Sequence, residues 1–216
     1  MRTIVKQPEP TSLTEYRVQD WSSYEGYADK EALRRALVTE QGELCCYCMR
    51  RISADRHAMK IEHWRPRSRH PTEQLDYGNL LAACRGGEGQ PPRLQHCDTR
   101  KGDSDLRWNP ADPANRIETR LRYEPDGTIR AHDDGEFDAQ LDEVLNLNLS
   151  LLKNNRKSAL DGILRWWQEE RARPRPVERA RLERERDRWR DGGDALKPYC
   201  QVVVWWLEQR LARLSP

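Results

Sequence analysis

The chain has 216 residues, of which 36% are hydrophobic and 34% are charged, and it contains 8 tryptophans and 7 tyrosines. So many large aromatic side chains argue against a wholly disordered chain, and the lack of any apolar run of roughly 18 residues excludes a transmembrane helix. The N-terminus has no apolar signal segment, so we expect a cytoplasmic protein with no membrane attachment. The net charge of +2 does not by itself indicate a nucleic-acid-binding protein.

The first predicted element is a helix over residues 29–41. Asp29 can cap its N-terminus, its leucines share one face, and Gly42 ends it. Loops and short elements then fill residues 43 to 103, where prolines and glycines are frequent. A segment with so little regular structure needs an additional constraint, which a bound metal can supply.

The second half of the chain predicts a β-hairpin followed by helices. The hairpin covers residues 117–131, where apolar and polar residues alternate around a Pro-Asp-Gly turn. A helical pattern begins at Phe137 and is broken at Pro174 and Pro176. The last helix covers residues 196–214, and its apolar residues follow steps of four and three, which is typical of packing against another helix.

Cysteines are concentrated in one region, because five of the six lie within 53 residues. In a cytosolic protein such clustering favours a metal site over disulfides. Cys45 and Cys48 form a C-x-x-C turn that can direct two thiolates to one structural Zn²⁺ ion. Cys84 and Cys97 are the natural second pair of ligands. Two alternatives stay open within this set: Cys46 in place of Cys45, and His96 in place of Cys97.

Three further motifs accompany the C-x-x-C turn. They are an acidic-His motif in residues 61–66, an Asn motif in residues 77–84, and a Cys-Asp-x-x-Lys motif in residues 96–102. Each is weak when taken alone, but their order is informative. The ordered set resembles the HNH endonuclease family, and in particular a subgroup with the pattern C-x-Y-C, I-E-H-x-x-P, Y-x-N-L-L-x-x-C and H-C-D-x-x-K-G. That subgroup includes the PtuB-like HNH subunit of Septu-type anti-phage systems, and the likeness covers residues 1 to 105.

The resemblance implies an α+β fold. Its centre is a ββα-metal HNH core stapled by a four-cysteine zinc site, to which a C-terminal α-helical lobe is attached. We expect three parts: an N-terminal segment and helix in residues 1–42, the zinc-bound nuclease core with the appended hairpin in residues 43–135, and the helical lobe in residues 136–216.

The resemblance also assigns roles that fit the chemistry of phosphodiester hydrolysis. His63 is the candidate general base, since imidazole titrates near neutral pH. Asn79 is expected to fix the loop that orients His63. Glu62 and Asp98 would hold a catalytic Mg²⁺ or Mn²⁺ ion through hard oxygen ligands. Asp98 replaces the His or Asn that is commoner at this point of the family. Three basic residues are candidate phosphate contacts in nucleic acid: Arg65, Arg67 and Lys101.

Neighbouring residues on a strand point to opposite faces, so Glu62 would point away from His63. The resemblance nevertheless implies that the acidic neighbour reaches the metal through a bent end of the hairpin. The expected function is that of a metal-dependent DNA endonuclease, the effector of an anti-phage defence complex with an ABC-type ATPase partner. Two alternatives stay open. One is a stand-alone restriction or homing-type HNH nuclease, and the other is a non-catalytic, zinc-stapled adaptor for nucleic acid or protein.

Overall fold

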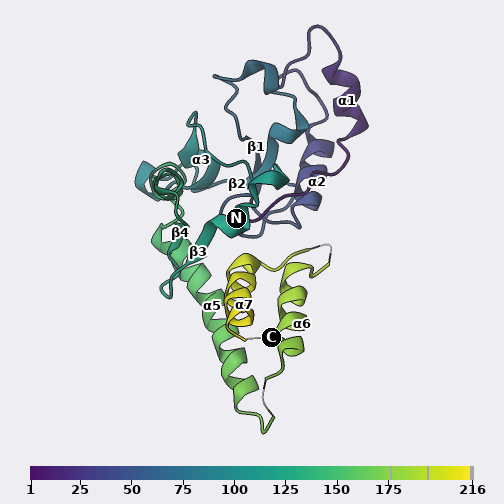
Figure 1. Cartoon of the computed structure of the whole chain (residues 1–216). Coiled ribbons are helices and arrows are strands. Elements are labelled where there is room, and N and C mark those ends of the chain that lie inside the picture. Colours follow the sequence, from purple (N-terminus) through teal and green to yellow (C-terminus); the bar gives the residue numbers. More distant parts are fainter. Residues whose placement is uncertain (176, 194, 215–216) are drawn as a thin grey trace.

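The computed structural model describes residues 1–175, 177–193 and 195–214, and shows a mixed α+β fold (Figure 1). The strands are β1 (Met59–His63), β2 (Leu80–Cys84), β3 (Leu121–Tyr123) and β4 (Ile129–Ala131). The helices are α1 (Thr11–Arg17), α2 (Lys30–Glu40), α3 (Cys97–Lys101), α4 (Gly135–Ala139), α5 (Ser150–Arg171), α6 (Arg179–Arg190) and α7 (Cys200–Arg213). Within these described ranges, no helix combines the length and the apolar character that crossing a bilayer requires.

Helix α2 confirms the first prediction. The Asp29 carboxylate accepts a hydrogen bond from the backbone N–H of Ala32 and so caps the helix. The predicted face is fully buried at Leu33 and Leu37, and the helix packs on β2. Gly42 follows the helix with φ +60°, a left-handed conformation that glycine adopts at little cost.

Strands β1 and β2 form an antiparallel hairpin in which Met59 pairs with Cys84 and His63 with Leu80. All five residues of β2 are buried, which explains its continuous apolar sequence. The end of β1, which carries Glu62 and His63, therefore lies beside the start of β2, which directly follows Asn79. A backbone hydrogen bond from Trp64 to Asn79, with an N–O distance of 3.0 Å, continues the pairing beyond the strands.

The second hairpin, β3–β4, is shorter than predicted. Residues 117–120 form a 3₁₀ turn, because the N–H of Thr119 bonds locally to Arg116 and not across the sheet. The predicted turn is confirmed at Gly127, which has φ +85°. Helix α5 crosses this turn so closely that a Cβ atom at Gly127 would lie 2.0 Å from the Lys153 carbonyl oxygen. The buried side chain of Arg156 also donates to the Gly127 carbonyl oxygen at 2.6 Å.

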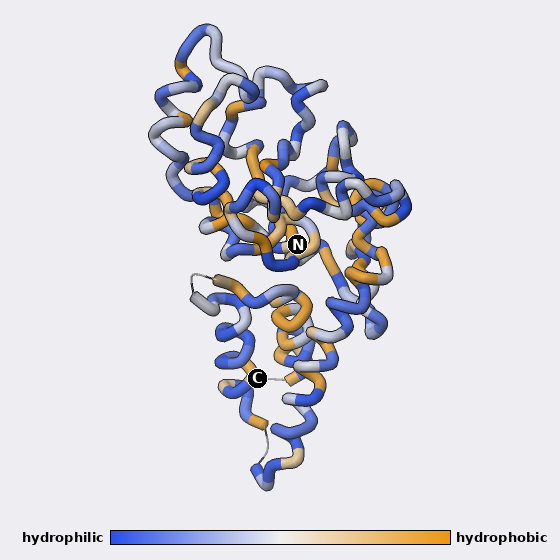
Figure 2. Tube along the Cα trace, turned by 180° about the vertical axis from the view of Figure 1, so that it is seen from behind, coloured by the Kyte–Doolittle hydropathy of each residue, from blue (hydrophilic) through white to orange (hydrophobic). Residues whose placement is uncertain are grey.

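The C-terminal residues form a helical lobe in which α7 packs against both α5 and α6 (Figure 1). Helix α5 ends at Arg171, before Pro174, whereas Pro176 lies outside the described residues. Figure 2 shows that α6 is largely hydrophilic and α7 largely hydrophobic. The apolar residues of α7 that we predicted to face another helix are buried at Cys200, Val204, Leu207 and Leu211.

Helix α7 begins four residues later than predicted, which corrects the range 196–214. The preceding segment is bound to the cysteine-bearing turn by two backbone hydrogen bonds of 3.0 Å, from Leu196 to Gly42 and from Tyr199 to Met49. Tyr199 then has φ +58°, which is incompatible with continuing a helix backwards. One buried apolar cluster extends from the N-terminal segment to α7, and the division at residues 42 and 135 stays a prediction.

Replacement of Gly127 by alanine should lower the free energy of unfolding by about 2 kcal/mol or more, because the new Cβ meets backbone and the left-handed φ becomes strained. Gly162→Ala is the matched control. Gly162 lies inside α5, and an added Cβ there would meet no atom within 4 Å, so this change should raise the free energy by about 0.5–1 kcal/mol. Urea denaturation measures the free energy of unfolding of both variants. A change of the same sign in the two variants would contradict the packing of α5 on the turn.

Candidate metal centre and active site

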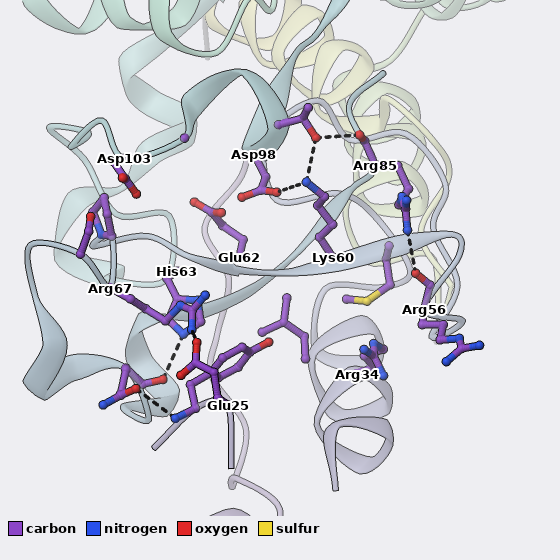
Figure 3. A pocket seen from close by; sticks show the side chains of 18 of the residues that line it. Glu25, Arg34, Arg56, Lys60, Glu62, His63, Arg67, Arg85, Asp98 and Asp103 are labelled. Carbon is purple, nitrogen blue, oxygen red and sulfur yellow. Dashed lines mark hydrogen bonds and ion pairs between the residues drawn. The ribbon is translucent and has the colours of Figure 1, made fainter. Parts of the chain in front are cut away.

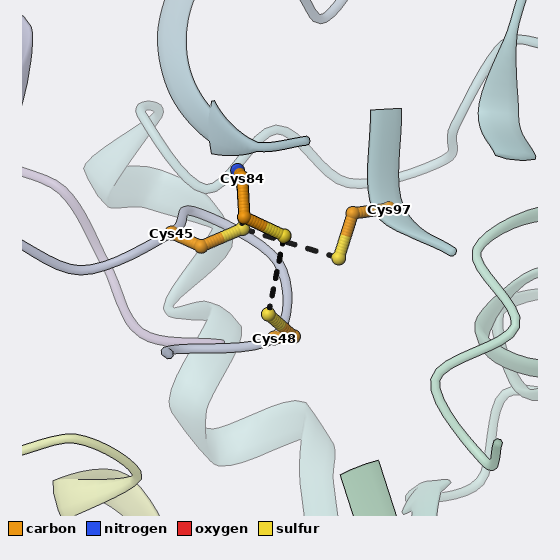
Figure 4. A group of neighbouring side chains, drawn as sticks. All are labelled: Cys45, Cys48, Cys84 and Cys97. Carbon is orange, nitrogen blue, oxygen red and sulfur yellow. Dashed lines mark hydrogen bonds between the residues drawn. The ribbon is translucent and has the colours of Figure 1, made fainter. Parts of the chain in front are cut away.

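Four cysteine sulfurs gather in the interior of the molecule (Figure 4). They belong to the four residues predicted as the first choice, Cys45, Cys48, Cys84 and Cys97, and all lie within 4.8 Å of one another. The Sγ–Sγ distances are 3.9 Å between Cys45 and Cys97 and 3.7 Å between Cys48 and Cys84. A tetrahedral Zn²⁺ with Zn–S bonds of about 2.3 Å requires sulfurs about 3.8 Å apart. The donor set therefore fits a structural zinc ion.

The two alternative ligands lie at the edge of this cluster. The Cys46 sulfur is not part of the group, and the Cys46 backbone N–H instead ties the turn to the Ala82 carbonyl oxygen of β2 at 3.0 Å. The His96 Nδ1 atom lies 3.2 Å from the Cys97 sulfur and 4.0 Å from the Cys84 sulfur. The geometry thus favours four sulfurs over a mixed set of sulfur and nitrogen.

The electrostatics of the four thiols also favour a cation. Burial would raise the pKa of Cys45, but hydrogen bonds from the neighbouring thiols hold it well below its ordinary value. Burial and the proximity of Cys45 raise the pKa of Cys97 well above its ordinary value. Without a metal, the cluster thus favours one thiolate and keeps neighbouring thiols protonated. A divalent cation stabilises several thiolates together.

The acidic-His pair opens into a cavity of about 800 Å³ (Figure 3). Glu62, His63 and Asp98 all line it. His63 is the last residue of β1, where the strand gives way to a loop, and this position allows two neighbouring side chains to reach the same cavity. Asp98 comes from the first turn of α3. The structure therefore brings together the three side chains that we expected at a catalytic centre.

His63 is held by its surroundings in the neutral form. Its Nε2 atom lies 3.0 Å from the Gln74 carbonyl oxygen, and because a carbonyl only accepts, Nε2 carries the hydrogen and Nδ1 is the basic nitrogen. The Tyr24 ring packs edge-on at 4.5 Å. Burial lowers the pKa of His63 to about 4. A neutral imidazole with an available Nδ1 can accept a proton from water.

Glu62 is a buried carboxylate at the centre of a polar network. Its Oε1 atom accepts hydrogen bonds from the Tyr47 hydroxyl and from the Lys101 ammonium, both at 2.8 Å. Burial, followed by the nearby Asp98 carboxylate, raises the pKa of Glu62 well above its ordinary value, whereas Lys101 opposes this shift. Two adjacent carboxylates that destabilise each other in this way suit a divalent cation, which takes oxygen ligands.

Asn79 holds the loop that follows His63. Its Oδ1 accepts from the Arg65 N–H at 2.7 Å, and its Nδ2 donates to the carbonyl oxygens of Arg65 and Glu73, both at 3.1 Å. The amide thus ties together the two ends of this loop. Such a buried network fixes the path of the backbone.

The three basic candidates occupy different places. Arg67 lines the cavity, where it pairs with Glu25 and stacks on Tyr24. Arg65 lies outside it and pairs with Glu73 at 2.7 Å.

Lys101 differs from our expectation. Its side chain is almost fully buried, with its ammonium bound to Glu62 and, at 3.0 Å, to the His63 carbonyl oxygen. It points away from solvent because it is the counter-ion of a buried carboxylate.

Several residues of the cavity escaped the sequence analysis. Lys60 lies 3.2 Å from Asp98 through its Nζ atom. Its position two residues before Glu62 on a strand places it on the same face, so period-two reasoning could have found it. Arg34, Arg56 and Arg85 also line the cavity. No local pattern marks them, because they come from α2 and from the two loops that flank the hairpin.

Replacement of Lys101 by methionine should destabilise the protein by about 3–5 kcal/mol, because it leaves the Glu62 carboxylate buried without a cation. Lys60→Met is the control. The Lys60 side chain is 27% exposed, so its loss should cost about 1 kcal/mol or less. Chemical denaturation distinguishes the two, and equal losses would contradict the proposed importance of the buried ion pair.

Zinc content tests the cysteine cluster. The purified protein should contain one equivalent of zinc by mass spectrometry. Cys48→Ser should lose most of this metal together with thermal stability, because three sulfurs bind zinc less tightly than four. Cys46→Ala, a change at the neighbouring buried thiol, should retain the metal. Equal loss of zinc from both variants would contradict the assignment of Cys48, and not Cys46, as a ligand.

No family model matches the chain. The chain is 27% identical over 170 residues to the "Retron Vc95 putative HNH endonuclease" of Vibrio cholerae serotype O1 biovar El Tor, and the match covers 72% of this chain and 80% of that protein. It is 26% identical over 102 residues to the Septu protein PtuB of Bacillus thuringiensis, covering 47% of this chain and 35% of that protein. The chain is thus a distant homologue of both proteins, and the first of them is described as a putative HNH endonuclease.

Proposed function

We propose that the protein is a metal-dependent DNA endonuclease with a ββα-metal core stapled by zinc. One observation carries the proposal: a neutral histidine and two carboxylates, His63, Glu62 and Asp98, line a single cavity. In the proposed core, β1 and β2 supply the hairpin and α3 supplies the helix. The homology to HNH proteins is the second support.

The cysteine cluster links structure to catalysis in this proposal. Cys84 ends β2, and Cys97 is the first residue of α3, directly before Asp98. A zinc ion bound to both cysteines would fix the helix to the hairpin. It would thereby set the position of Asp98 relative to Glu62 without taking part in the reaction.

Within the cavity, each residue has a chemical role. Glu62 and Asp98 would hold Mg²⁺ or Mn²⁺, which supplies positive charge to the phosphate and to the departing oxygen. Tyr47 and Lys101 both donate to the Oε1 atom of Glu62 and so hold the carboxylate in place. His63 takes a proton from water through Nδ1 as the water oxygen attacks the phosphorus and the bond from phosphorus to the departing oxygen breaks. The Gln74 carbonyl oxygen orients the ring and stabilises the imidazolium that forms.

The distant match to the Septu protein PtuB supports a proposal about the biological setting. We propose that the protein acts as the effector nuclease of an anti-phage defence complex, together with an ABC-type ATPase. An unrestrained nuclease would damage the DNA of its own cell, so control by a partner fits this chemistry. The alternatives are a stand-alone nuclease and an adaptor, and plasmid nicking separates the adaptor from either nuclease.

Nicking of supercoiled plasmid with Mg²⁺ or Mn²⁺ tests the catalytic proposal. His63→Ala should reduce the rate by about 10²–10⁴-fold, which is the usual contribution of general base catalysis. His132→Ala is the control, because that side chain is 62% exposed and, in the described part of the chain, pairs only with Asp133. Its rate should be unchanged. Equal nicking by the wild type and His63→Ala would overturn the assignment of His63. A wild type that binds DNA but does not nick it would favour the adaptor.

A further inference from the structure

Arginines lie on both sides of the cavity: Arg67 is beside His63, and three others gather at the opposite side (Figure 3). His63, Glu62 and Asp98 lie at one side, where the proposed reaction takes place. Arg34, Arg56 and Arg85 lie at the other side, and Lys60 stands between the two groups. An arrangement of several guanidinium groups at one end of a cavity is unfavourable unless anions compensate for their charge.

Arg34 has the least compensated charge of the group. It comes from α2, and its Nε atom is buried with no hydrogen-bond partner among the residues that the structure describes. Among the described residues, no carboxylate lies within 4.0 Å of its guanidinium. Its neighbour Arg35 provides the contrast, since that side chain is 58% exposed and pairs with Glu31 at 2.5 Å. A buried donor that lacks a partner is unfavourable, and an incoming acceptor would remove this cost.

Arg56 is similarly free of a carboxylate partner in the described part of the chain. Its Nε atom donates to His57 at 3.0 Å, and its carbonyl oxygen accepts from Arg85 at 3.1 Å. Arg85 itself is neutralised by Glu88. The unmatched positive charge at this end of the cavity therefore belongs to two residues, Arg34 and Arg56.

We propose that Arg34 and Arg56 form a phosphate-binding site for the DNA strand, next to the phosphate that is cleaved at His63. This inference rests on the proposed function, since it takes DNA as the substrate. Guanidinium groups match phosphate oxygens in charge and geometry. The aromatic rings that line the cavity, Tyr24 and His63, contact each other at its other side. The arginine side thus suits the backbone of a strand and not a stacked base.

Fluorescence anisotropy with a labelled DNA duplex tests the site, in EDTA and over a range of salt concentrations. Arg34→Gln and Arg56→Gln should each weaken binding several-fold. Each should also reduce the slope of log affinity against log salt by about 0.9, the value for one lost phosphate contact. The double variant should lose about twice that amount. Arg35→Gln, one residue away on the same helix, should leave both quantities unchanged.

Thermal unfolding of each variant establishes that it is folded, and Arg56 lies in a loop where substitution perturbs the fold less than in α2. Wild-type affinity and salt slope in both single variants would overturn the proposal, as would a wild type that does not bind DNA. The catalytic proposal can fail separately. Loss of nicking in His63→Ala, together with a wild-type salt slope in both arginine variants, supports the catalytic proposal alone. A reduced salt slope in the arginine variants, with no nicking by the wild type or any variant, supports the phosphate site alone.

Discussion

The convergence of four buried sulfurs is the constraint on which the rest of the structure depends. Residues 43 to 103 contain two strands of five residues and a helix of five, and elements this short bury too little apolar surface to hold one another. The sulfurs connect the turn after α2, the end of β2 and the start of α3. Because Asp98 follows Cys97 directly, whatever fixes the cluster also fixes one wall of the cavity.

A second constraint acts beneath the cavity, where charge is buried. Glu62 is held between Tyr47 and Lys101, and Lys101 also binds the carbonyl oxygen of His63. One ammonium group thus fixes two consecutive residues of β1. Removing any partner from such a network leaves a buried group uncompensated, so the network favours one arrangement of the site over others. The nearby Asp98 adds negative charge that a divalent cation would balance.

The helical lobe is attached to the same cysteine-bearing turn. Backbone hydrogen bonds from Leu196 and Tyr199 reach the residues on either side of the turn, and Cys200 packs with Leu44 and Met49 in a small apolar cluster. The lobe is therefore joined to the four-cysteine region by direct contacts, in addition to its chain connection through α5. Cys200 of the apolar α7 and Trp189 of the largely hydrophilic α6 both contribute to this junction (Figure 2).

Local sequence determined the chemistry of this protein: the cysteine set, the order of the motifs, the cap of α2 at Asp29 and the turn at Gly127 all follow from neighbours along the chain. The tertiary structure decided which groups meet. It separated Cys46 from the sulfur cluster, turned Lys101 inward to Glu62, and brought Arg34 from a distant helix into the cavity. The reason is physical. Spacing along the chain fixes local conformation and the type of ligand, whereas the direction of a buried charge depends on partners that only long-range packing supplies.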